Sequence, residues 1–220
     1  MSNERVINGN KLDTNELMSL VSAEQYDKLE EAWLGIVESN NKDLQSLFDV
    51  VELLIKREER KRAHEFLMML VPYYKQKGLY QEVLKVLKRV LEYNPKEKGL
   101  ANEIAECYSN IYKDRPYTKD LVEKTGITTG IDIQGAMKNL EKYFYLDRGD
   151  YVYHKSWGVG EVVSVDADSE KVNINFEKKS NHSIAMDIAP EILQKLEKDD
   201  LLAMIYAQKE VLNKMIKEDP

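Results

Sequence analysis

The sequence predicts an α+β protein that is mainly helical: a helical array comes first, then a small closed β-barrel and a C-terminal amphipathic helix. Two observations lead to this fold class. Up to residue 145, apolar residues recur every three or four positions, as on the buried face of a helix. Beyond it they alternate with polar residues in short runs, which is typical of strands. The expected divisions are a flexible N-terminus at 1–13, helices at 14–145, the barrel at 146–196 and the last helix at 197–220.

Two capping boxes predict the start of the helical part. The first, at 13–16, precedes a short helix, and the second, at 22–25, precedes a longer helix that Asn40 and Asn41 are expected to end. A further helix follows from residue 44 to 55, and the mixed charges at 56–62 are interpreted as a solvated helix end.

The segment that begins at His64 has the spacing of two packed helices, with Gly78 at the turn between them and Pro95 at the end. Its packing positions are Leu67, Val71, Tyr74, Val83, Leu87 and Val90. The pattern resembles a tetratricopeptide repeat, a unit of about 34 residues. Asp49 and the break at Arg115 depart from that repeat, so a generic helical bundle stays open as an alternative. Such arrays present a groove to a peptide or protein, which makes a peptide in the helical groove one predicted partner.

The connection between the array and the barrel contains Pro116 and several glycines. It is expected to act as a hinge with one short helix at 118–124. A last helix of the array, at 133–145, is expected to dock the barrel.

Four or five short strands are predicted in the barrel region. They run over 151–153, 159–165, 171–176 and 183–188, with a turn that carries Gly158 and Gly160 and further turns at 166–170 and 177–182. So few short strands cannot hide both faces of a flat sheet, which favours a closed barrel of SH3 or Tudor type. The glycines are expected to allow positive φ angles or close backbone approach.

The turn after the first strand holds the candidate partner-binding residues. These are Tyr153, His154, Lys155, Trp157 and Val159. Trp157 is expected either to cover the end of the barrel or to serve as an exposed aromatic anchor for a partner. His154 and His182 are expected to approach each other across adjacent strands and to hydrogen-bond to the backbone.

One spacing in this region resembles a known family. It comprises Leu146, Gly149, Val152, His154, Trp157, Gly158 and Gly160, followed by Val172, Ile174, Phe176, His182 and Met186. It is similar to the barrel in the long N-terminal extension of certain Gre-type bacterial transcription elongation factors, which also place helical repeats before the barrel. It is also similar to the RNA-polymerase-interacting barrel of CarD and of transcription-repair coupling factor, although there the histidine directly precedes Gly-Val-Gly.

The resemblance implies a non-catalytic region that recruits or contacts RNA polymerase along an open strand edge. The alternative is a general scaffold that binds a protein or peptide in the helical groove, with no link to transcription. Gre factors stimulate transcript cleavage with acidic residues at the tip of a long helical hairpin, which this chain lacks. Asp199 and Asp200 are interpreted as charges at the start of the last helix, which is expected to lead on into a longer protein.

Composition narrows the remaining function classes. The net charge is −7, and residues 147–196 carry six basic and nine acidic side chains, which disfavours direct binding of nucleic acid. No run reaches the roughly 18 apolar residues of a membrane span, so a cytoplasmic protein without membrane contact is expected. Cys107 is the single cysteine and is expected to be buried. Without a nucleophile–base pair, metal cluster or phosphate loop, no enzyme, cofactor or metal is expected.

Overall fold

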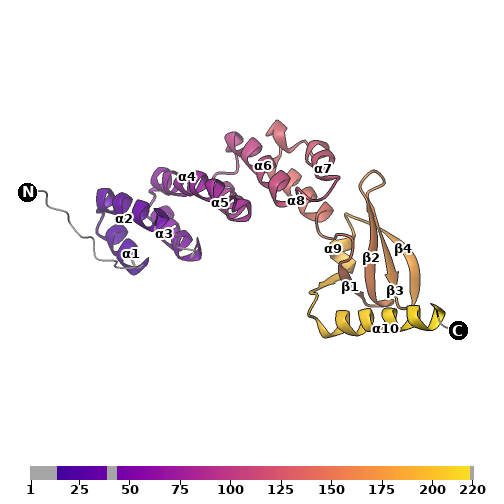
Figure 1. Ribbon diagram of the computed structural model, residues 1–220. Coiled ribbons are helices and arrows are strands. Elements are labelled where there is room, and N and C mark those ends of the chain that lie inside the picture. Colours follow the sequence, from indigo (N-terminus) through magenta and orange to yellow (C-terminus); the bar gives the residue numbers. More distant parts are fainter. Residues whose placement is uncertain (1–13, 39–43, 219–220) are drawn as a thin grey trace, which may run out of the picture. The chain divides into compact units, whose positions relative to one another are not determined.

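The computed structural model describes residues 14–38 and 44–218 and divides into two compact units, Met1–Leu100 and Ala101–Pro220. The first unit is helical. The second holds further helices and, within the described residues, a five-stranded antiparallel sheet (Figure 1). A mainly helical α+β chain is therefore confirmed. The predicted flexible N-terminus at 1–13, and the predicted helix stop at Asn40 and Asn41, lie outside the described residues.

The first unit is built from amphipathic helices whose apolar stripes face one another. Its elements are α1 (Thr14–Ser22), α2 (Tyr26–Glu38), α3 (Leu44–Lys56), α4 (Arg60–Gln76), α5 (Tyr80–Tyr93) and the 3-10 helix η1 (Lys98–Leu100). Trp33 is fully buried, and its ring centroid lies 5.1 Å from that of Phe66. All six packing positions predicted for α4 and α5 are buried, and Gly78 has a positive φ of 68° in the turn between the helices. The predicted helices are confirmed, while their assignment to a repeat family stays a prediction.

The prediction that residues 22–25 form a capping box at the start of a helix is wrong. Ser22 is the last residue of α1, and residues 23–25 form the turn that ends this helix. The Gln25 N–H donates to the carbonyl of Leu20 at 3.0 Å, while Glu24 has a positive φ of 57°. This is the hydrogen-bond pattern of a helix C-terminus, and a glycine or asparagine would normally mark it.

The helices of the second unit are α6 (Ala101–Ile111), α7 (Thr118–Lys124), the 3-10 helix η2 (Ile127–Thr129) and α8 (Ile133–Tyr143). The short helix predicted at 118–124 is confirmed. Leu121 and Ile127 are almost completely buried, so the segment is a packed part of this unit and does not fit the hinge expected there. Cys107 is buried in α6, as predicted.

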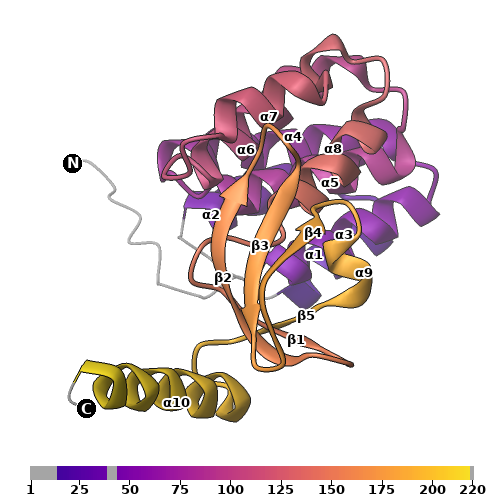
Figure 2. The ribbon, with the colours of Figure 1, turned by 90° about the vertical axis from the view of Figure 1, so that its right-hand side faces the viewer.

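The sheet consists of β1 (Tyr151–His154), β2 (Gly158–Asp166), β3 (Lys171–Phe176), β4 (Lys179–Ala185) and β5 (Gln194–Leu196), in the order β4-β3-β2-β1-β5. Figure 2 shows the turn between β1 and β2 at one end and the turn between β2 and β3 at the other. Three predicted boundaries are wrong, and one of them is the end of β4, which lies at Ala185 rather than at 188. Gly158 and Gly160 belong to β2 rather than to the turn before it. β4 begins at Lys179 rather than at 183, because an irregularity in its pairing with β3 and a positive φ of 50° at Asn181 carry the strand through polar residues.

The two faces of the sheet bury different partners. Its larger core contains Val162, Val172, Ile174 and Phe176 together with residues around the short helix α9 (Ala189–Ile192). The three β3 residues share this face, as predicted. On the opposite face, Val159 and Leu196 pack against Ala203 and Tyr206 of α10 (Leu201–Glu218). The Asp200 side chain accepts the Leu202 N–H at 2.8 Å, which confirms its place at the start of α10.

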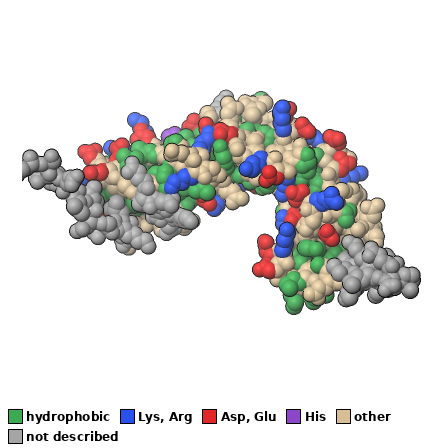
Figure 3. Space-filling view, in the orientation of Figure 1, with side chains coloured by type: hydrophobic (Ala, Val, Ile, Leu, Met, Phe, Trp, Pro, Cys, Tyr) green, Lys and Arg blue, Asp and Glu red, His purple; other side chains and the backbone are tan. Residues whose placement is uncertain are grey.

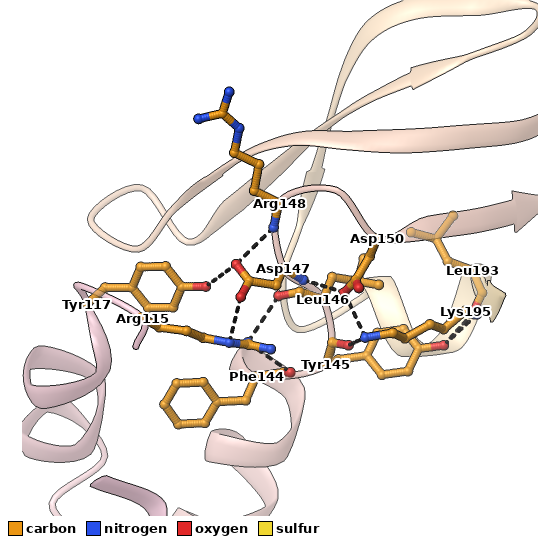
Figure 4. A network of polar contacts seen from close by, with 10 residues as sticks. All are labelled: Arg115, Tyr117, Phe144, Tyr145, Leu146, Asp147, Arg148, Asp150, Leu193 and Lys195. Carbon is orange, nitrogen blue, oxygen red and sulfur yellow. Dashed lines mark hydrogen bonds and ion pairs between the residues drawn. The ribbon is translucent and has the colours of Figure 1, made fainter. Parts of the chain in front are cut away.

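A partly buried polar joint fixes the sheet to the helices of its own unit (Figure 4). Arg115 Nε lies 2.9 Å from Asp147 Oδ2, and the same guanidinium donates to the carbonyls of Phe144 and Leu146 at 3.1 and 3.3 Å. Tyr117 donates to the other Asp147 oxygen at 3.2 Å, and partial burial raises its pKa to about 12. The planar guanidinium thus ties the segment after α8 to the segment after α6.

A second contact of the joint comes from Tyr145. Its hydroxyl donates to the Leu193 carbonyl at 3.0 Å and accepts the Lys195 N–H at 3.1 Å. This confirms the prediction that the end of the last helix of the array docks the sheet.

We expect Arg115→Ala to lower the free energy of unfolding of the second unit by about 1–2 kcal/mol, because it removes a solvent-screened ion pair to Asp147 and two hydrogen bonds to backbone carbonyls. The Arg115 side chain is only 14% exposed. Urea unfolding, followed by Trp157 emission in a Trp33→Phe background, measures the change. Arg148→Ala is the matched control, because that side chain points away from the joint in Figure 4. Equal effects of the two substitutions would contradict this role of Arg115.

Candidate functional site

Two turns meet at one end of the sheet and form the candidate site. One is the β1–β2 turn at 155–157 and the other is the β3–β4 turn at 177–178. The Lys178 N–H donates to the Trp157 carbonyl at 3.3 Å, which joins the turns directly. We call these turns, together with the adjoining His154, Phe176, Lys179 and His182, the tryptophan tip.

Trp157 is the centre of the tip. The His154 ring stacks on it at a centroid distance of 3.9 Å and an interplanar angle of 13°. His182 meets it edge-on at 4.2 Å, Phe176 packs on it at 5.3 Å, and Lys179 Nζ lies 4.7 Å from its ring centroid. The indole is half-buried and contacts the larger sheet core through Phe176. Trp157 therefore covers the end of the core and still contributes to the surface.

The two histidines meet through Trp157 and not across adjacent strands. His154 is on β1 and His182 is on β4, and these strands are separated by β2 and β3. The prediction that the two histidines lie on adjacent strands is therefore wrong. His154 Nδ1 accepts the Ser156 N–H at 3.1 Å, which confirms the expected backbone hydrogen bond for this residue. Partial burial, followed by the charges of Lys179 and His154, lowers the pKa of His182 below its usual range.

The tip is locally basic. Lys155, Lys178 and Lys179 are exposed, and among the described residues no acidic side chain forms an ion pair with any of them. The one acidic residue of the turns, Glu177, instead lies 3.5 Å from Lys209 of α10. Acidic and basic side chains are interspersed over the face drawn in Figure 3. The tip therefore differs from that mixed surface in carrying three lysines without acidic partners.

Gly160 allows the packing below Trp157. It pairs with Phe176 across β2 and β3, and a Cβ atom at Gly160 would lie 2.6 Å from Phe176 Cδ1 and 2.8 Å from the carbonyl oxygen of Asn175. Gly149 and Gly158 have positive φ angles of 83° and 78°. Both predicted uses of glycine, close approach and positive φ, are confirmed.

The structure brings only part of the predicted site together. His154 and Trp157 stack, and Lys155 is exposed on the turn between them. Tyr153 is 37% exposed and pairs with Val159, which is 5% exposed and packs toward α10. Because successive side chains of a strand point to opposite faces, Tyr153 and Val159 lie on the face away from His154.

Lys178 and Lys179 were missed as site residues. The predicted order of the hairpins could have identified them, because alternate turns of an antiparallel meander lie at the same end of the sheet. Phe176 and His182 were noted for their spacing, but their contact with Trp157 required the register of β3 and β4.

Neither a cluster of three metal-ligating side chains nor a helix that could span a bilayer occurs among the described residues. Within 14–38 and 44–218, no three His, Cys, Asp or Glu side chains are grouped so that they could hold a metal ion. In the same part of the chain, no helix combines the length and the apolar character needed to cross a bilayer.

A hollow lies in the first unit. It has a volume of about 350 Å³ and is lined by Arg60, Lys61, His64, Tyr93, Asn94 and Glu97. The Tyr93 hydroxyl is buried and has no hydrogen-bond partner among the described residues. Burial, with the nearby Glu97 as the next cause, raises the pKa of Tyr93 to about 12. This hollow is a feature of the helical unit that could take a peptide side chain.

Comparison with known proteins relates the chain to bacterial transcription factors. A GreA-associated domains protein of Treponema pallidum is 24% identical over 223 residues, which cover 96% of this chain and 33% of that protein. The transcription elongation factor GreA of Borreliella burgdorferi is 24% identical over 90% of this chain and 22% of its own length. GreA of Chlamydia trachomatis is 26% identical over 68% of this chain and 21% of its own length.

These similarities are weak but extend over much of the chain, which spans a third or less of each of these relatives. No protein-family model and no solved structure matches the chain.

We expect Gly160→Ala to destabilise the second unit by about 2–4 kcal/mol, because the added methyl group overlaps the Phe176 ring and the β3 backbone. The displaced Phe176 no longer supports Trp157, so the emission of Trp157 shifts toward that of a solvated indole. Urea unfolding and emission spectra in the Trp33→Phe background measure both effects. Gly99→Ala is the control, since its Cβ would lie at an ordinary contact distance of 3.6 Å from Glu97 Oε1. An unshifted emission maximum would contradict the proposed support of Trp157 by Phe176.

Proposed function

We propose that this chain is a non-catalytic protein-binding region of a Gre-type bacterial transcription elongation factor and that it contacts RNA polymerase through the tryptophan tip. The observation that carries the proposal is the similarity to GreA of Borreliella burgdorferi over 90% of the chain, tip and helices included. The chain aligns with 22% of that GreA, a share that fits an accessory region of a longer factor. This role belongs in the cytoplasm, where transcription takes place.

The tip has the properties of a protein-binding site. Tryptophan is enriched among the residues that dominate binding energy, and such residues act best when their conformation is already fixed. Trp157 is held by His154, His182 and Phe176 before any partner arrives. A partner therefore finds an ordered aromatic group and does not have to order it.

The edge of β4 offers a second element of the same contact. β4 ends the hydrogen-bonded order of the sheet, and Met186 N donates to the Glu170 carbonyl at 2.9 Å. Every second residue of β4, counted back from Met186, therefore points its backbone groups toward β3, while Ser183 presents its own to the open edge. The carbonyl of Ala185 on that edge already accepts the Ile188 N–H at 3.2 Å. Strand addition there would bring a partner segment alongside the tip.

We also propose that the helices form a tetratricopeptide-like array and that the sheet forms a barrel of SH3 or Tudor type.

The hollow lined by His64 and Tyr93 favours the second candidate function, a scaffold that binds a peptide in the helical unit without a link to transcription. Its buried, unpaired Tyr93 hydroxyl is a polar group that a bound peptide could satisfy. The two candidates place the contact in different units of the chain, so substitutions distinguish them.

The test is a pull-down of bacterial RNA polymerase by the full chain and by Trp157→Ala. Loss of one anchoring aromatic residue is expected to weaken binding by about 2 kcal/mol, roughly thirtyfold. Lys155→Ala serves as a second tip variant, because its exposed side chain can be removed without affecting the core. Ile131→Ala is the control, since Ile131 is 87% exposed in the same unit but lies outside the tip.

Circular dichroism verifies that each variant is folded. Retention of polymerase by the parent chain and its loss by the folded tip variants supports the proposal. Polymerase binding that survives both tip substitutions would refute the contact at the tip. Failure of the folded parent chain to retain polymerase would refute the link to transcription.

A further inference from the structure

We propose that the tryptophan tip receives an acidic segment of its protein partner, and that Lys155 and Lys178 supply the complementary charge. The identity of the partner as RNA polymerase rests on the proposed function, whereas the chemistry of the segment rests on the charges of this chain alone.

The first argument is the separation of charge along the sheet. Residues 147–196 contain six basic side chains, and three of them, Lys155, Lys178 and Lys179, are in the tip. At the opposite end, visible in Figure 2, Asp166 ends β2, and the following turn carries Asp168 and Glu170, the latter paired with Lys124. A region with a net negative charge thus presents a basic end. An acidic segment is attracted to the tip and repelled by the rest of the sheet, which also fixes its orientation.

The second argument is that two lysines of the tip are available to form ion pairs with a partner. Glu177, the nearest acidic residue in sequence, lies against Gly158 and pairs with Lys209. The Lys179 ammonium lies over the Trp157 ring, so Lys155 and Lys178 are left to pair with a partner. Both are exposed, and neither forms an ion pair with an acidic side chain in the part of the chain that the structure describes.

The third argument favours a protein over a nucleic acid. Single-stranded nucleic acids are bound by stacking bases on open aromatic faces. His154 stacks on Trp157 at 3.9 Å and Lys179 Nζ lies 4.7 Å from its ring centroid, so a base would have to compete with these side chains for the ring. Two exposed lysines beside a half-buried indole suit carboxylates on a protein surface better than a base-stacking strand.

The test compares the full chain with Lys155→Glu/Lys178→Glu and with the matched control Lys113→Glu/Lys138→Glu. The control reverses two exposed lysines on the helical part of the same unit. All three proteins are titrated with RNA polymerase, with a short oligoglutamate peptide and with oligothymidylate. Circular dichroism confirms folding, and Lys155→Gln/Lys178→Gln separates loss of attraction from added repulsion.

We expect the tip reversal to weaken binding of polymerase and of oligoglutamate at least about tenfold, and the control reversal to change it less than about twofold. Raising the salt concentration from about 0.05 M to about 0.5 M should weaken binding of the parent chain and have little effect on the residual binding of the tip variant.

The outcomes separate this inference from the proposed function. Polymerase binding that the tip reversal leaves unchanged would overturn the acidic segment while leaving the polymerase contact standing. Oligoglutamate binding that depends on the two lysines, without polymerase binding by the parent, would support the acidic segment and overturn the polymerase assignment. Tight binding of oligothymidylate in place of oligoglutamate would show a nucleic-acid site and overturn the inference.

Discussion

The close approach of β2 and β3 at Gly160 is the constraint on which the candidate site depends. The Phe176 ring occupies the space that a side chain at position 160 would need, and Trp157 rests against that ring at 5.3 Å. A small sheet cannot enclose its core at both ends, so a large aromatic residue must cover the open end. The same residue that completes the core therefore remains partly exposed. This double role explains how a surface aromatic group can be rigid enough to serve as an anchor.

Most of the fold was predictable because its elements have strong local patterns. The buried faces of α4, α5 and β3 follow from periodicity alone, and the short helix α7 was expected between Pro116 and the glycines that follow it. The end of α1 was not predictable, because Glu24 adopts a positive φ where glycine or asparagine is the usual signal. The start of β4 was missed for a different reason. An edge strand tolerates polar side chains, so residues 179–182 look like a turn until their pairing with β3 is known.

The candidate site was predictable only in part, because it is assembled from two turns that are distant in sequence. The unusual spacing around His154 and Trp157 identified one turn, and simple alternation already implies that Tyr153 and Val159 face the other way. The contribution of Lys179 and His182 depends on the strand order, which local patterns do not specify. The basic character of the tip was hidden by the acidic total of its region, since a net charge does not report where the charges lie.

Hydrogen exchange of the full chain, with and without bacterial RNA polymerase, tests the central claim most directly. If polymerase is bound through the tryptophan tip, amide protection should increase at residues 154–160 and 176–185, which cover the two turns and the β4 edge. The helices around the His64 hollow should exchange as they do in the free chain. Protection confined to residues 60–97, or none in the sheet when polymerase is bound, would contradict the account and place the contact in the helical unit.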